Sequence, residues 1–402
     1  MLRKLAWLKY LAFAFILGFI FSILMYQGFW YPFIAGIKTI RWWAYPLWVI
    51  LTFWVTLTIH ELGHLFAFVF QGVKIRGLFL HMLSLYRSPK GWRIKLKIKL
   101  WFLLGGFVVP DLGVIADDQT YEKRLVQFRR SLIAAPIVSI AFLGVTMLIF
   151  LILNIIHAPA NVLGSFTLFT VYTTLLSILY IRSFSMSNAS FYGDFVAYKK
   201  MKDDPVFQVT QLSQYTMFAL HPSEETDRYF FERIKTMIQS IDLKSSLFYQ
   251  MLLLNYMEGV CYHQYPDDPI VREKLMRYPL HPHFHTEQGL TLLYDLASYH
   301  YTIGHIEKAY QLIETIQKKA SPKIDEKMRL YLEKKHLHIL HIAYDQPFLD
   351  RADHVVYRNS KLFEDILDLH EIMRSMHEPL PFKRWETPVN LEPKEEKSDI
   401  PS

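Results

Sequence analysis

Two scarcities in this 402-residue sequence are informative. Cys261 is the single cysteine, which excludes a disulfide-stabilised scaffold. Acidic side chains are rare in the front half: residues 1–200 contain 20 lysines and arginines but 6 acids, whereas residues 201–402 contain 24 and 31. The net charge of +7 therefore describes a basic front half joined to a mildly acidic back half, and it does not indicate a nucleic-acid-binding protein. With 52% apolar residues, extensive disorder is also excluded.

Charged side chains are absent from long stretches of the front half. Residues 11–30 contain none, and residues 131–181 contain none over 51 positions. A bilayer core of about 30 Å requires about 20 apolar helical residues, so the second stretch has room for two spans. Buried helices of a soluble protein, or a cleaved signal peptide for the first stretch, fit these lengths less well. We predict four membrane helices, at about residues 8–30, 46–70, 131–155 and 162–182.

The distribution of lysine and arginine predicts how these helices are oriented. Residues 71–130 carry 12 basic and 4 acidic side chains, whereas the turn at residues 156–161 carries none. Because basic residues accumulate in cytosolic loops, we expect the N-terminus, residues 71–130 and the chain after about residue 183 to be cytosolic. The sequence thus predicts a multi-pass integral protein, and we expect it in a bacterial cell membrane.

One charged residue stands inside the second predicted span. Glu61 is the only charged side chain in residues 42–73, and placing a carboxylate there costs about 2.5–3.5 kcal/mol. It belongs to a His-Glu-x-x-His motif in which His60 and His64 share one helix face and can bind one metal ion. Glu61 lies beside that face and is the candidate general base. Zinc with three protein ligands keeps a position open for water, so we expect one Zn²⁺ ion.

Two alternatives to a metal site remain at this point. The motif can arise by chance in a chain with 17 histidines. It can also be a buried His–Glu pair with a structural role. Both fit poorly with three polar side chains on one turn of a membrane helix, where ionisable groups are costly.

Three further motifs follow His-Glu-Leu-Gly-His at 60–64. They are Gly-Gly-Phe-Val at 105–108, Arg-Ser-Leu-Ile-Ala-Ala-Pro at 130–136 and Gly-Asp at 193–194. Together they resemble the site-2 protease family of intramembrane zinc metalloproteases. The resemblance covers about residues 45–200. Ala135 stands where the family usually has glycine, the Asp-Gly order is inverted, and the turn at 156–161 leaves no room for a PDZ domain, so the resemblance implies a divergent member.

A zinc site of this kind needs a third protein ligand. The resemblance places it at Asp194, which follows a span that can pack beside the motif helix. The alternative for Asp194 is a solvated carboxylate at the membrane surface. Asp111 is the next candidate, followed by Asp117 and Asp118, all in the segment before the third predicted span.

The basic segment between the second and third spans has a strand pattern. Residues 93–100 alternate strictly between basic and apolar side chains, which predicts a β-strand with one cationic face. We expect residues 73–86 to form its partner strand and residues 89–91 to form the turn of a membrane-associated hairpin. The cationic face suits anionic lipid, and an exposed edge can bind an extended substrate by strand addition. A purely lipid-anchoring hairpin is the alternative.

The sequence predicts that the back half of the chain forms a domain separate from the membrane helices. We expect a membrane domain at residues 1–200, an all-α, tetratricopeptide-like cytosolic domain at 201–378 and a disordered tail at 379–402. Residues 293–310 have the spacing of a helix–turn–helix repeat. Such a domain can bind a regulator or a substrate tail; packing or oligomerisation is the alternative.

These observations predict an intramembrane zinc endopeptidase that cleaves membrane proteins or peptides near the cytosolic face. The expected partners are membrane lipid, a transmembrane substrate and a protein regulator, with no nucleic acid. The main alternative is an inactive membrane scaffold that binds proteins through its helical domain. A metal transporter fits less well, because no further acids or histidines line the predicted spans.

Overall fold

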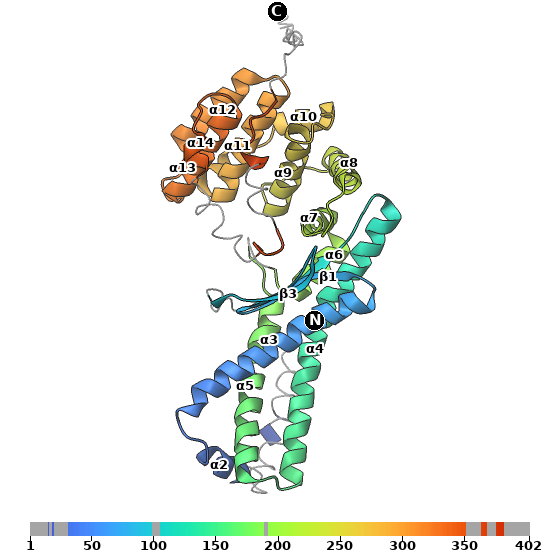
Figure 1. The fold of residues 1–402 in the computed structure, drawn as a ribbon, viewed down its shortest axis with the longest axis vertical. Coiled ribbons are helices and arrows are strands. Elements are labelled where there is room, and N and C mark those ends of the chain that lie inside the picture. The colour runs from blue at the N-terminus through green and yellow to red at the C-terminus, as the bar shows by residue number, and fades with distance from the viewer. Residues whose placement is uncertain are drawn as a thin grey trace, which may run out of the picture. The chain divides into compact units, whose positions relative to one another are not determined.

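The computed structural model describes residues 15, 18–19, 31–98, 105–188, 192–350, 363–367 and 375–381 (Figure 1). The first predicted span, residues 8–30, and the predicted tail lie almost entirely outside the described residues. The chain forms two compact units. The first comprises Met1–Gly113, Asp118–Pro205 and Phe218–His221, and the second comprises Val114–Asp117, Val206–Met217 and Pro222–Ser402.

Long apolar helices dominate the first unit. Its helices are α2 (Tyr31–Lys38), α3 (Ala44–Phe70), α4 (Asp118–Ile155), α5 (Ala160–Phe184) and α6 (Asp194–Asp203). Among the described residues, α3, α4 and α5 are long and apolar enough to cross a membrane. They include the predicted spans at 46–70, 131–155 and 162–182. Their outward side chains are apolar, as at Leu148, Ile178 and Leu179, and this suits contact with lipid.

Small side chains let these helices approach one another closely. A Cβ atom on Gly63 of α3 would lie 2.7 Å from the Cα atom of Ala135 on α4. In lipid, where apolar contact alone gives little preference for protein, such close backbone packing is a main source of helix association. Some hydroxyls inside the bundle are satisfied within their own helix, as where Thr56 Oγ1 donates to the Thr52 carbonyl at 2.7 Å. Figure 1 shows α4 and α5 running side by side.

A four-stranded antiparallel sheet follows α3. Its strands are β1 (Lys74–Leu80), β2 (Leu83–Ser88), β3 (Gly91–Leu96) and β4 (Gly106–Asp111), in the order β3-β2-β1-β4. The β2–β3 hairpin agrees with the predicted turn at residues 89–91, although residues 99 and 100 of the predicted strand are not described. The prediction of one partner strand over 73–86 is wrong. The chain reverses at His81, whose φ of 48° ends β1, and this splits the segment into two strands.

The sheet lies along α3. The His81 ring is 5.0 Å from the Phe53 ring and 5.5 Å from the Trp54 ring, well before the C-terminal end of that helix. Non-helical backbone beside a membrane helix is tolerated where its hydrogen bonds are made within the protein, and the strand ladders make them here. The edge strand β3 exposes Trp92, Ile94 and Leu96 on one face.

Every regular element of the described second unit is helical. These elements are α7 (Pro205–Thr216), α8 (Glu224–Ser240), α9 (Leu247–Cys261), α10 (Pro269–Met276), η3 (His281–His285), α11 (Glu287–Thr302), α12 (Ile306–Lys319), α13 (Glu326–Ile339) and α14 (Gln346–Leu349). Helix α11 is the centre of this unit, since most of its side chains are buried and it contacts α9, α12 and α13. The predicted helix–turn–helix at 293–310 falls on α11 and α12, which join at Gly304 with a φ of 87°.

The contact at Gly63 generates a stability prediction. Gly63→Ala places a methyl group against the α4 backbone, and overpacking of this kind costs about 1–3 kcal/mol. Gly144→Ala, on α4, is the matched control, because its Cβ atom meets nothing within 4 Å. We expect thermal unfolding in detergent to occur at a lower temperature for Gly63→Ala than for Gly144→Ala. Equal unfolding temperatures would contradict the importance of this contact.

Candidate metal and catalytic site

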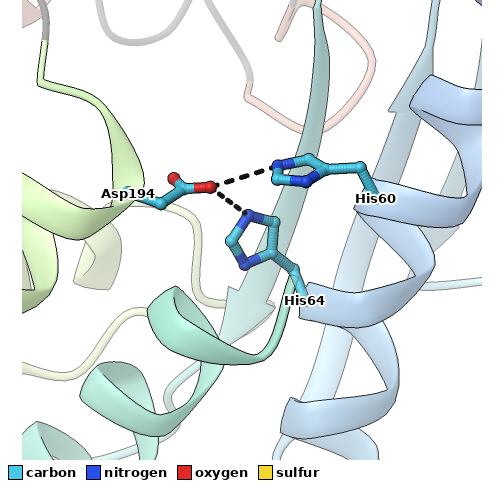
Figure 2. Close-up of side chains that lie close together, drawn as sticks. All are labelled: His60, His64 and Asp194. Carbon is cyan, nitrogen blue, oxygen red and sulfur yellow. Dashed lines mark ion pairs between the residues drawn. The ribbon is translucent and has the colours of Figure 1, made fainter. Parts of the chain in front are cut away.

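Helix α3 places the three residues of the motif on one buried turn. His60 and Glu61 are 8% and 5% exposed. The rings of His60 and His64 lie on one face with centroids 5.1 Å apart and an angle of 86° between their planes. Both imidazoles therefore direct one edge into the same space, as Figure 2 shows.

Helix α4 orients both imidazoles. The Nδ1 atom of His64 lies 2.9 Å from the Ser131 carbonyl oxygen, which can only accept a hydrogen bond, so Nδ1 carries the proton. The Nδ1 atom of His60 lies 3.0 Å from the Ser139 hydroxyl. These contacts leave the Nε2 atoms facing the site, as is usual for histidines that bind a metal through Nε2. No sequence pattern distinguished Ser139, since the hydroxyl of a serine in an apolar span ordinarily hydrogen-bonds within its own helix.

Asp194 reaches the same space from α6. Its Oδ2 atom lies 3.1 Å from His60 Nε2 and 3.6 Å from His64 Nε2 (Figure 2). Gly193 brings the chain back against the end of α5, since a Cβ atom there would lie 2.1 Å from the Ser183 carbonyl oxygen. The Gly193 N–H also donates to the Met186 carbonyl at 2.9 Å. The glycine therefore has to precede the aspartate here, and this accounts for the inverted order in the sequence.

The charge state of Asp194 follows from its surroundings. Burial by itself would raise the pKa of this carboxyl, but the adjacent imidazoles of His60 and His64 outweigh that effect and hold its pKa well below the ordinary range. Asp194 is therefore ionised at neutral pH, as a metal ligand must be.

These three side chains fit a divalent metal ion. Their ligand atoms all lie within 4.8 Å of one another. The two Nε2 atoms and the buried Asp194 Oδ2 atom thus converge on one space, where a cation would neutralise the carboxylate. Separations near 3 Å are those expected for two ligands of one ion with metal–ligand bonds of about 2 Å.

The Glu61 side chain contacts strand β4. The Gly106 backbone hydrogen-bonds to its carboxylate, and a Cβ atom on Gly106 would lie 2.3 Å from Glu61 Cγ. Only glycine leaves room for the carboxylate at this position. The second glycine of the Gly-Gly-Phe-Val motif therefore contacts Glu61, the candidate base. The sequence did not predict that this motif lies on a strand, β4.

Aromatic side chains of α5 form one wall of the site. The Phe184 ring lies nearly parallel to the His60 ring, with centroids 4.9 Å apart. One helical turn earlier, the Tyr180 ring is 6.4 Å from the His60 ring. The sequence does not distinguish these two residues from the many aromatics that pack in or beside a membrane helix, so neither was a candidate.

The other predicted ligands lie elsewhere. Asp111 ends β4, and its Oδ1 atom accepts a hydrogen bond from the Gly113 N–H at 3.2 Å. Asp117 and Asp118 lie at the start of α4. Within the described residues, His60, His64 and Asp194 form the group of potential ligands, and these three aspartates are not part of it.

Comparison with known proteins identifies the family of the chain. The model of a family described as Peptidase family M50 matches residues 48–326, which include α3, the sheet, Asp194 and much of the helical second unit. No curated protein and no solved structure matches the chain. The family match covers more than half of the chain, so the protein belongs to peptidase family M50, the site-2 protease family of membrane metallopeptidases.

Proposed function

We propose that the protein is an intramembrane zinc endopeptidase that cleaves membrane proteins or peptides near the cytosolic face. The observation that carries this proposal is the convergence of His60, His64 and Asp194 beside Glu61, on a helix long and apolar enough to span a membrane. An inactive scaffold has no need of such a constellation, and buried charges of this kind are costly.

The donor set favours zinc. Two imidazoles and one carboxylate, with a further position open, are typical of hydrolytic zinc sites. When bound, such an ion polarises the scissile carbonyl and lowers the pKa of the attacking water to about 7. Ser131 and Ser139 of α4 hold the imidazoles in the required orientation.

Glu61 performs the proton transfers in this proposal. Its carboxylate takes a proton from the attacking water while the oxygen–carbon bond forms, and it then gives that proton to the amine nitrogen as the carbon–nitrogen bond breaks. The contact with Gly106 fixes the carboxylate beside the sheet, where a substrate bound to the sheet can reach it.

An extended substrate fits the sheet. A helical peptide bond is shielded by its own helix, so a membrane protease must unwind its substrate. Strand addition to an exposed edge of the sheet supplies backbone hydrogen bonds to the unwound segment. The exposed apolar face of β3 and its basic residues also suit contact with lipid and anionic head groups.

The remaining partners are proposed from the sequence pattern. We place the N-terminus and the helical second unit in the cytosol of a bacterial cell, and we propose that the second unit is tetratricopeptide-like and binds a regulator or a substrate tail. The antiparallel pair α11 and α12 supports this proposal. Nucleic acid has no role in it.

Replacing the general base tests the activity. Glu61→Gln preserves shape but cannot take a proton, so we expect cleavage to fall about 10²–10⁴-fold with the zinc content unchanged. The measurement is proteomics of membrane proteins and released fragments in cells making either form, followed by assay of purified protein. Glu122→Gln, on an exposed residue of α4, is the matched control. Retained cleavage by purified Glu61→Gln would end the proposal.

Removing the third ligand tests the metal site. Asp194→Ala leaves two imidazoles, so we expect the zinc content of purified protein, measured by elemental analysis, to fall from one ion per chain to a small fraction. Asp203→Ala, exposed on the same helix, and Asp111→Ala, which removes the next candidate, should retain the ion. Undiminished zinc in Asp194→Ala would exclude this residue as a ligand.

The hydrogen bond between the Ser139 hydroxyl of α4 and His60 Nδ1 leads to a prediction about zinc affinity. Ser139→Ala removes the partner of His60 Nδ1 without touching a ligand, and losses of this kind weaken metal affinity about 10–100-fold. Competition with a chelator of known affinity measures the change. Ser183→Ala, whose hydroxyl donates to the Tyr180 carbonyl in its own helix, is the control. Equal zinc affinities for Ser139→Ala and the control would show that this contact does not orient the imidazole.

A further inference from the structure

The packing around Tyr180 does not explain why this residue carries a hydroxyl group. Its hydroxyl is buried and has no hydrogen-bond partner within the described parts of the chain. Buried tyrosine hydroxyls ordinarily find a partner, because the donor otherwise loses its contact with water. A phenylalanine would fill the same space at no such cost, and residue 184, one turn later, is one.

The position of Tyr180 connects this hydroxyl to the reacting groups. Its ring is inclined by 25° to that of His60 at 6.4 Å, and it lies 6.2 Å from the Phe184 ring, which covers His60. Tyr180 therefore lies beside His60, one of the candidate metal ligands, and next to the ring that covers it.

This hydroxyl can add a hydrogen bond to the polarisation that a bound metal ion would give the scissile carbonyl. The Nε2 atoms of His60 and His64 and the Asp194 carboxylate would be occupied as metal ligands, and the Gly106 backbone is already bonded to Glu61. Hydrolysis of a peptide bond creates negative charge on the carbonyl oxygen. A positioned donor for that charge is one of the strongest single contributions to such reactions. The phenolic O–H is a neutral donor of this type.

We propose that Tyr180 is a catalytic residue that donates a hydrogen bond to the scissile carbonyl oxygen as it becomes the oxyanion of the tetrahedral intermediate. This inference rests on the proposed peptidase function. The water oxygen bonds to the carbonyl carbon, the carbonyl π pair moves to the oxygen, and Tyr180 stabilises that oxygen without transferring its proton. When the pair returns and the carbon–nitrogen bond breaks, the amine leaves with the proton held by Glu61.

The decisive variant is Tyr180→Phe, assayed in detergent or liposomes on a transmembrane peptide that the wild-type protein cleaves. We expect kcat to fall about 10²–10³-fold, KM to stay within about twofold and bound zinc to remain at one ion per chain. Tyr172→Phe, at a half-buried position of the same helix, is the matched control and should behave as wild type.

A binding measurement separates stabilisation of the oxyanion from other roles. A phosphinic peptide carries a tetrahedral, negatively charged centre, so its affinity should fall in Tyr180→Phe by the same factor as kcat. The intact peptide should bind equally to Glu61→Gln and to the double variant Glu61→Gln with Tyr180→Phe. Weaker binding of the intact peptide, or unchanged kcat and unchanged phosphinic-peptide affinity, would overturn the inference.

Three further outcomes are distinguishable. If Tyr180→Phe loses zinc or fails to fold, Tyr180→3-fluorotyrosine keeps the ring and changes only the strength of the donor. A kcat that responds to this change with zinc intact supports the inference, and an unchanged kcat overturns it.

If the wild-type protein cleaves no membrane peptide, the proposed function itself fails. If wild type cleaves and Tyr180→Phe equals it, only the role of Tyr180 fails.

Discussion

The close contact between α3 and α4 at Gly63 and Ala135 is the constraint on which the site depends. Because the two backbones approach there, α4 reaches the imidazoles on either side of that glycine. The Ser131 carbonyl and the Ser139 hydroxyl then fix the two rings from their Nδ1 sides. A larger residue at position 63 would separate the helices and leave the imidazoles free to rotate. The packing of these two membrane helices therefore also supplies the hydrogen bonds that orient the candidate metal ligands.

Two further glycines extend this principle. Gly193 lets the chain return tightly over the end of α5, and this return delivers Asp194 to the Nε2 atoms. Gly106 lets β4 press against Glu61, so that the carboxylate has a backbone donor within a low-dielectric environment. At Gly106 the missing side chain makes room for the carboxylate itself, and at Gly193 it makes room for the backbone of α5. Polar groups at this depth have no bulk water to solvate them, so their partners have to come from the protein.

The sheet shows where sequence patterning was sufficient and where it failed. Strict alternation and a Pro-Lys-Gly turn predicted the β2–β3 hairpin, because period-two patterns are local. The reversal at His81 was missed, since it needs a positive φ at a residue that carries no turn signal. Strand β4 was also missed, because its pairing with β1 spans a long loop and its sequence was recognised as a motif without its role as a strand.

The sequence by itself determined the apolar helices, the His-Glu-x-x-His turn and the family resemblance, because uncharged runs and fixed spacings are written in consecutive residues. It also named Asp194, by its place after a span, but left Asp111, Asp117 and Asp118 as alternatives. Only the tertiary structure showed that Asp194, and not the other three, lies beside the two imidazoles, since side chains from α3 and α6 meet through the packing of α4 and α5. It alone showed that Ser139 and Tyr180 face the site, because an apolar span gives no sign of which side chains point inward.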